Sequence, residues 1–213
     1  ASAPFFTSLG ANMIIENYYN TLYKVQSNLE LPTLKDDCIF LNEYIDYTYS
    51  EKKGVYADEK APTSTKVFNH YNLLSSPSYQ FYKLYTEIKK AFTETSGKTE
   101  NFYIQAWVNV FKKGQQLSWH GHFPEEANAW HGYFCVDAEP SITEYKFSFL
   151  GDTITPIENK NNTIVIGKSG QDVHKTVIWD KEEPRITIAF DIVPVEFLQS
   201  LDETHYINHW LPL

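Results

Sequence analysis

The chain has 213 residues, 42% of them hydrophobic and 21% charged, which is the composition of one globular domain rather than of a disordered segment. Its 27 acidic and 18 basic residues leave a formal charge of −9, which argues against a nucleic-acid partner because binding phosphates requires a basic surface. No apolar run approaches the roughly 20 residues that span a bilayer, so we expect no membrane segment, and the two cysteines favour a reducing, cytoplasmic setting.

Two helices are predicted in the first hundred residues. Between residues 33 and 49, apolar side chains recur at spacings of three and four, as on one face of a helix: Leu34, Cys38, Leu41, Ile45 and Tyr49. A second helix is expected to begin at Ser76-Pro77, a cap residue followed by proline at the first helical position, and to stop near Gly97. Its inward-pointing side chains would be Tyr79, Phe81, Tyr82, Tyr85, Ile88 and Phe92.

From about residue 101 the pattern changes to the two-residue period of β-strands. We predict strands at residues 103–111, 130–136, 144–150, 163–166, 175–179 and 185–193, separated by clusters of Gly, Pro, Asn and Asp. The connections are too short for crossover helices, so the strands should pair antiparallel and form an α+β, mainly β fold of the jelly-roll type. We expect a single domain over 1–213, with a mixed helical part at 1–98, the jelly-roll core at 99–194 and a docking tail at 195–213.

Three of the seven histidines lie within twelve positions: His120, His122 and His131. His120 and His122 are two residues apart, so on an extended segment their imidazoles project to the same side and suit a single transition metal. The alternative is a solvated surface pair beside Trp119, stacked against its indole.

The last long strand carries a second polar feature. Arg185 and Thr187 alternate with Ala189 on one face, while Ile186 and Ile188 point to the other. A guanidinium binds a carboxylate through two parallel hydrogen bonds and a hydroxyl adds a third donor, so this face is suited to hold a carboxylate inside a barrel. The alternative is a surface salt bridge to one of the nearby acidic residues.

Several segments follow one another in a fixed order within residues 101–194: Gly114, Trp119-His120-Gly121-His122-Phe123-Pro124, His131-Gly132-Tyr133-Phe134, His174 and Arg185-Ile186-Thr187. In this order they resemble the Fe(II)/2-oxoglutarate-dependent oxygenases. The likeness is nearest to uncharacterised phage and bacterial members, in which a Trp-Val-Asn strand, here Trp107-Val108-Asn109, precedes a His-x-His-Pro-like turn.

The resemblance implies a double-stranded β-helix that holds Fe(II) at one open end and uses 2-oxoglutarate as cosubstrate. The positions of the metal ligands are matched by His120, His122 and His174. His122 stands where most of these oxygenases have Asp or Glu. Glu125 or Glu126 would supply a carboxylate if the turn folded back, and His131 is a further alternative ligand.

By the same resemblance, Arg185 and Thr187 would bind the far carboxylate of 2-oxoglutarate. Cys135 stands where relatives often place a tyrosine that bonds this carboxylate, which leaves more of the task to neighbouring side chains: Asn109, Tyr133 and Tyr103. The residues expected to support the site or to face the substrate are His131, Trp107, Trp119 and Cys135.

The activity implied is hydroxylation of a polypeptide side chain or a small molecule, with release of succinate and carbon dioxide, by a chain that could form a homodimer. Two other functions stay open. One is a cupin-like three-histidine metalloenzyme that does not use 2-oxoglutarate, in which Arg185 binds the substrate's own carboxylate. The other is a non-enzymatic jelly-roll binding module whose histidines are surface features.

Overall fold

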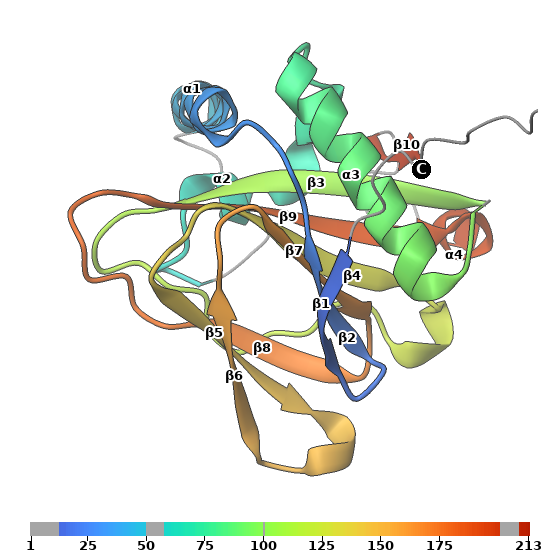
Figure 1. Cartoon of the computed structure of the whole chain (residues 1–213). Helices are drawn as coiled ribbons and strands as arrows, with labels where there is room; N and C mark the ends of the chain where they lie inside the picture. The colour runs from blue at the N-terminus through green and yellow to red at the C-terminus, as the bar shows by residue number, and fades with distance from the viewer. Residues whose placement is uncertain (1–12, 50–57, 100, 201–208) are drawn as a thin grey trace, which may run out of the picture.

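The computed structural model describes residues 13–49, 58–99, 101–200 and 209–213. These residues form two antiparallel sheets (Figure 1), a major one in the order β1-β2-β7-β4-β9-β3-β10 and a minor one in the order β6-β5-β8. The strands of the major sheet are β1 (Met13–Tyr18), β2 (Leu22–Gln26), β3 (Phe102–Phe111), β4 (Trp130–Asp137), β7 (Thr163–Lys168), β9 (Arg185–Pro194) and β10 (Leu211–Pro212). The strands of the minor sheet are β5 (Ser141–Phe147), β6 (Ile154–Asn159) and β8 (Asp172–Thr176). The predicted mainly β, jelly-roll fold is confirmed.

Strands with strong two-residue alternation lie where the sequence predicts them. β3 and β9 differ by one residue from the predicted 103–111 and 185–193. The strand expected at 144–150 is β5 followed by a 3-10 turn, η4 (Ser148–Leu150), and the strand expected at 175–179 is β8, which starts three residues earlier. β1 and β2 were not predicted; they form a hairpin around Tyr19 and Asn20, which both have positive φ.

Four α-helices and three further 3-10 turns complete the described part of the chain. They are α1 (Leu31–Tyr49), α2 (Thr63–Lys66), α3 (Tyr79–Ser96), α4 (Val195–Ser200), η1 (Phe68–His70), η2 (Leu73–Ser75) and η3 (Glu125–Ala127). Helices α1 and α3 lie on one side of the major sheet and the minor sheet lies on the other (Figure 1). None of these helices is long and apolar enough to cross a membrane.

Helix α3 begins two residues later than predicted, because Ser78 rather than Ser76 caps it. The Ser78 hydroxyl accepts hydrogen bonds from the backbone N–H groups of Gln80 and Phe81, and the helix ends at Gly97 with φ of 70° as expected. The prediction that Tyr79 and Tyr82 point inward is wrong: their exposed fractions are 68% and 61%. The prediction is confirmed for Phe81, Ile88 and Phe92, and the buried side also includes Gln80, Leu84 and Ala91.

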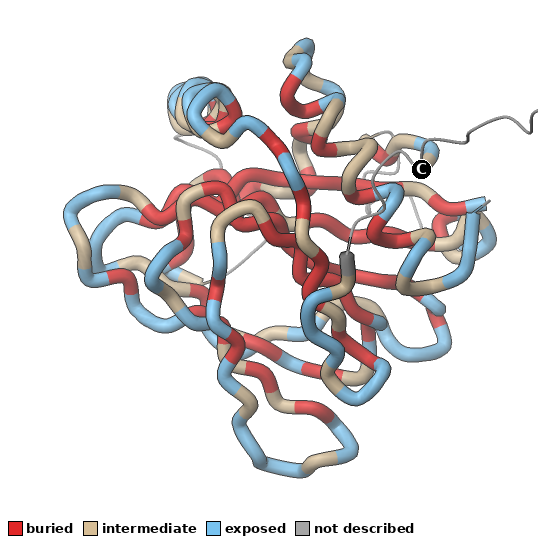
Figure 2. The backbone as a smooth tube through the Cα atoms, viewed as in Figure 1, coloured by how far each residue is buried: buried red, intermediate tan, exposed pale blue. Residues whose placement is uncertain are grey.

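The two faces of β9 serve two different layers. On one face of β9, four side chains are fully buried in the core under the helices: Ile186, Ile188, Phe190 and Ile192. Figure 2 shows the middle of the major sheet as a mostly buried, red zone. The odd-numbered residues of β9 face the space between the two sheets, so the predicted separation of Arg185 and Thr187 from the isoleucines is confirmed. Next to this polar face, a second apolar cluster around Tyr145 and Phe147 packs between the two sheets.

The first hundred residues also contribute directly to the sheet that carries the site. Strand β2 pairs with β7, and helix α1 packs on β3 and β4, so residues 13–49 share the core of residues 102–194. At the other end of the chain, β10 pairs with β3 and Trp210 is buried. The organisation of 1–213 as a single domain stays a prediction.

Candidate functional site

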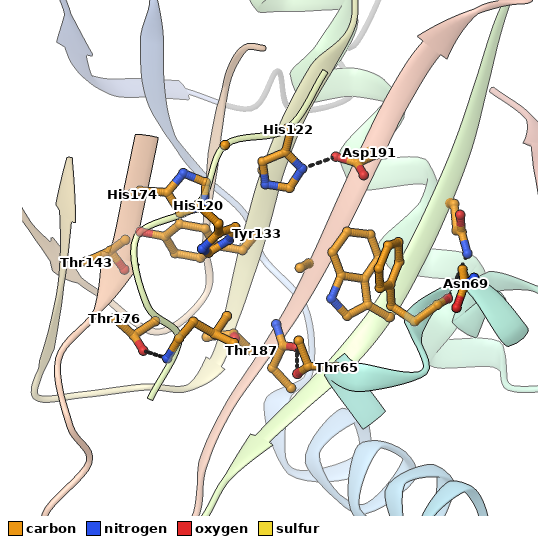
Figure 3. Close-up of a pocket in the computed structure, with 18 of the residues that line it drawn as sticks. Thr65, Asn69, His120, His122, Tyr133, Thr143, His174, Thr176, Thr187 and Asp191 are labelled. Atoms are coloured by element: carbon orange, nitrogen blue, oxygen red, sulfur yellow. Dashed lines mark hydrogen bonds and ion pairs between the residues drawn. The ribbon is translucent and has the colours of Figure 1, made fainter. Parts of the chain in front are cut away.

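A cavity of about 610 Å³ opens between the two sheets (Figure 3). Its floor consists of alternate side chains of the two central strands: Gln105, Trp107, Asn109 and Phe111 on β3, and Arg185, Thr187, Ala189 and Asp191 on β9. The minor sheet supplies the opposite wall through Thr143, His174 and Thr176. Because β3 and β9 pair residue for residue, Asn109 lies beside Thr187, and Gln105 beside Asp191.

Three histidines come together in this cavity. The backbones of His120 and His174 exchange two hydrogen bonds, of 3.0 and 2.9 Å, which brings the segment after β3 alongside β8. His122 lies two residues further along that segment, and each of the three side chains offers a ring nitrogen within 4.8 Å of the other two. This separation suits three imidazoles that share one transition-metal ion.

The hydrogen bonds of these histidines select one tautomer of each ring. Nδ1 of His120 lies 2.8 Å from the carbonyl oxygen of Ser118, Nδ1 of His122 lies 2.6 Å from Oδ1 of Asp191, and Nδ1 of His174 lies 3.2 Å from Oδ1 of Asp172. All three partners are acceptors, so in the neutral rings Nδ1 carries the proton and Nε2 keeps its lone pair. The site therefore presents three basic Nε2 atoms.

Burial and mutual repulsion set the protonation of two of the rings. Desolvation, followed by the neighbouring imidazoles, lowers the pKa of His120 well below its usual value. Desolvation also lowers the pKa of His174 to about 4, although the bond to Asp172 opposes it. At neutral pH both rings are neutral, the form that binds a metal ion. Burial also acts on His122, but the adjacent charge and hydrogen bond of Asp191 outweigh it and raise that pKa.

The fourth histidine of this region, His131, makes a different bond. Its Nε2 lies 3.1 Å from Oδ2 of Asp172, the carboxylate whose other oxygen accepts from His174. Both contacts are buried, and the two imidazoles hold the pKa of Asp172 well below its usual range despite desolvation. Although His131, Asp172 and His174 also lie close enough together to hold a metal ion, both oxygens of Asp172 are already hydrogen-bonded. His131 therefore supports His174 through Asp172.

Glu125 and Glu126 do not provide the carboxylate considered from the sequence. Both are exposed on η3, and Glu125 accepts a hydrogen bond from Gln171 instead. The carboxylates beside the histidines are Asp172 and Asp191, which sequence reasoning missed. A signal for both existed: Asp191 continues the alternation of Arg185 and Thr187 along β9, and Asp172 is two residues before His174 on β8.

Arg185 is the only arginine of the sequence, and it lies buried in the same cavity with an exposed fraction of 3%. Its Nε donates to Oγ of Ser141 at 2.9 Å and its guanidinium lies 4.8 Å from the ring centre of Phe111. No carboxylate of the described residues pairs with it, and one terminal nitrogen has no hydrogen-bond partner there. Burial lowers its pKa, but a guanidinium remains charged at neutral pH. The alternative of a surface salt bridge is wrong, and a buried cation of this kind calls for an anionic ligand.

The other predicted cosubstrate residues border this cation. Thr187 is buried beside it, and Asn109, its cross-strand neighbour, accepts a 2.5 Å hydrogen bond from the Thr65 hydroxyl. Tyr133 also lines the cavity, with its hydroxyl donating to Asn159 at 2.8 Å. Tyr103 packs with another cluster near α4 and is not part of the cavity.

Of the remaining predicted residues, Trp107 lines the cavity but Trp119 and Cys135 do not. Trp119 is 36% exposed and lies on the outer side, with the ammonium groups of Lys146 and Lys175 about 5 Å from its ring centre. Cys135 is fully buried among apolar side chains, and burial raises the pKa of its thiol to about 11. It is a small packing residue and not a nucleophile.

No protein-family profile and no curated protein sequence matches the chain. Solved structures match its fold: AviO1 from Streptomyces viridochromogenes Tue57 has a TM-score of 0.56 at 10% identity, over 81% of this chain and 89% of that chain. A prolyl-4-hydroxylase from Pseudomonas putida has a TM-score of 0.53 at 10% identity, over 81% and 92%. The non-heme α-ketoglutarate-dependent epimerase SnoN from nogalamycin biosynthesis has 0.51 at 10% identity, over 82% and 78%. The chain therefore has the jelly-roll fold of structures of 2-oxoglutarate–Fe(II) oxygenases.

Proposed function

We propose that this protein is an Fe(II)- and 2-oxoglutarate-dependent dioxygenase that oxidises an organic substrate, most simply by hydroxylation, with release of succinate and carbon dioxide. One observation carries the proposal: three imidazoles with basic Nε2 atoms lie in one cavity with a buried guanidinium that has no carboxylate partner in the described part of the chain. The fold supports it, since a structure of SnoN contains Fe3+ together with α-ketoglutarate and nogalamycin RO.

The residues present fit both groups. His120, His122 and His174 would hold the metal ion through their Nε2 atoms. Arg185 and Thr187 would bind the far carboxylate of 2-oxoglutarate through the unpaired guanidinium nitrogen and a hydroxyl. When bound, iron and the keto acid supply the oxidative decarboxylation that activates oxygen.

The aspartates next to the histidines compensate for a metal site made of neutral ligands only. A facial triad of two histidines and one carboxylate gives the metal a negative charge directly, whereas here Asp172 and Asp191 place their charges one hydrogen bond behind His174 and His122. Such bonds raise the basicity of the imidazoles and fix their orientation.

The test is an anaerobic titration of the metal-free protein with Fe(II) and then 2-oxoglutarate, followed by visible absorption of the chelated keto acid. We expect a weak charge-transfer band that needs both additions, disappears in His174→Ala and requires much more 2-oxoglutarate in Arg185→Met. Lys112→Met removes an exposed cation outside the cavity and is the matched control, expected to behave as wild type.

Two results would contradict the proposal. Iron binding without the band would favour the three-histidine metalloenzyme that does not use 2-oxoglutarate, a function that the all-histidine donor set also suits. Absence of stoichiometric iron binding would favour a binding module with the same fold.

A further inference from the structure

The cavity continues beyond the histidines into an end lined by aromatic rings. Trp107 and Phe68 lie with ring centres 4.9 Å apart, and Phe123 and Trp210 lie 6.4 Å apart. These four rings come from β3, η1, the segment after His122 and the C-terminal segment, so distant parts of the chain converge here. Flat apolar walls of this kind bind apolar or aromatic groups.

Two polar atoms at this end have no hydrogen-bond partner among the residues that the structure describes. The side-chain oxygen of Asn69 and the indole N–H of Trp210 are both buried and unbonded, and each residue has an exposed fraction of 8%. The neighbouring amide is occupied, because Gln105 donates to the carbonyl oxygens of Phe68 and Tyr71. A buried acceptor and a buried donor that stay unbonded are costly, so each suits a ligand group of opposite character.

The charges of the cavity argue against an anionic ligand at this end. Apart from histidines, the lining residues of acidic or basic type in the described part of the chain are Arg185 and Asp191. Arg185 lies at the opposite end of β9, and Asp191 is held by His122 at 2.6 Å. An anion next to Asn69 and Trp210 would therefore have no counter-charge.

We infer that this aromatic end binds a neutral aromatic small molecule carrying a hydroxyl group, which donates to Asn69 Oδ1 and accepts from Trp210 Nε1. The inference rests on the proposed function, since it names the substrate class of that site. The size of the cavity agrees with a small molecule, because pockets of 300–1,000 Å³ typically enclose one. Because both polar atoms are buried, the hydroxyl group of the ligand would have to lie inside the cavity to bond them.

The experiment uses 2-naphthol and 2-naphthoate, two probes of the same ring system that differ in charge at pH 7. Binding is measured by calorimetry under anaerobic conditions on protein saturated with Fe(II) and 2-oxoglutarate, so that 2-naphthoate cannot use Arg185. We expect 2-naphthol to bind at least tenfold more tightly than 2-naphthoate. Asn69→Ala and Trp210→Phe should each weaken 2-naphthol binding by roughly three- to tenfold, the usual effect of one lost hydrogen bond.

Trp119→Phe is the control, since this tryptophan lies on the outer side and its replacement should leave both affinities unchanged. Equal binding of the two probes, or 2-naphthol binding that neither cavity variant changes, would overturn the inference. The charge-transfer band recorded first on the same samples separates the two failures. A band without probe preference would support the oxygenase and contradict this ligand class. Probe preference without a band would support the ligand class and contradict the oxygenase.

Discussion

Gly132 lies between His131 and Tyr133 on β4, and its replacement by alanine tests how tightly β4 is packed in the core of the major sheet. A Cβ atom at this position would lie 2.3 Å from the carbonyl oxygen of Val165 and 2.6 and 2.9 Å from the ring of Phe190. The first is backbone of the paired strand β7, and the second is a fully buried ring, so neither can move aside at low cost.

The expected cost follows from these contacts. Forcing one methyl group into a close-packed core costs about 1–3 kcal/mol, and moving β4 away from β7 weakens ladder hydrogen bonds worth about 1 kcal/mol each. The unfolded chain has a lower backbone entropy with alanine than with glycine, which offsets somewhat less than 1 kcal/mol of this destabilisation. Gly132→Ala should therefore lower the free energy of unfolding by about 3 kcal/mol, equivalent to a fall in Tm of roughly 6–12 °C.

Urea unfolding of metal-free protein, followed by tryptophan fluorescence and circular dichroism, measures this change. Gly121→Ala is the matched control, because its Cβ would meet only Val173 Cγ1 at 3.4 Å and the backbone oxygen of Asp172 at 3.5 Å. We expect that control to stay within 1 kcal/mol of wild type. If Gly132→Ala were equally mild, the close packing of β4 between β7 and β9 would be refuted.

Three further predictions follow from the site. Asp172→Asn should weaken Co(II) binding by roughly 10–100-fold in a spectroscopic titration, because its carboxylate orients the imidazole of His174; unchanged affinity would argue against that role. Burial lowers the pKa of His174 to about 4, so between pH 6.5 and 4 the unfolded chain binds a proton that the folded chain does not. On acidification through that range, this group should lower the free energy of unfolding of the metal-free protein by about 3 kcal/mol. His122, whose pKa is raised despite burial, opposes this effect. Urea unfolding in the presence of a chelator measures it, and a free energy of unfolding that does not change with pH would contradict the prediction. Cys38 and Cys135 should not react with iodoacetamide at pH 8 until the protein unfolds, since burial raises both thiol pKa values, and mass spectrometry would detect a native adduct if either were reactive.

Several features of the site could be predicted because they depend on local geometry. The two-residue period of a strand places Arg185 and Thr187 on one face whatever the rest of the chain does. The spacing of His120 and His122 likewise keeps both imidazoles on one side of an extended segment. Helix α1 followed from its apolar stripe in the same way.

Other expectations failed where a local pattern allowed more than one arrangement. The inward side of α3 was predicted correctly for Phe81, Ile88 and Phe92 but wrongly for Tyr79 and Tyr82, because aromatic residues occur on both sides of this helix and the core buries only one of them. The hairpin of β1 and β2 was missed because its strands mix polar and apolar residues, and their pairing with β7 stabilises them.

The sequence by itself determined the antiparallel strand series, the face of β9 that carries the only arginine, and the histidine spacing, all of which follow from short-range periodicity. Only the tertiary structure decided which carboxylates support the histidines, since Asp172 and Asp191 come from different sheets. It also decided that Trp119 faces outward and that Asn69 and Trp210 meet the cavity. The physical reason is that hydrogen bonding and burial at this site join residues far apart in the chain, and no local period records which of them meet.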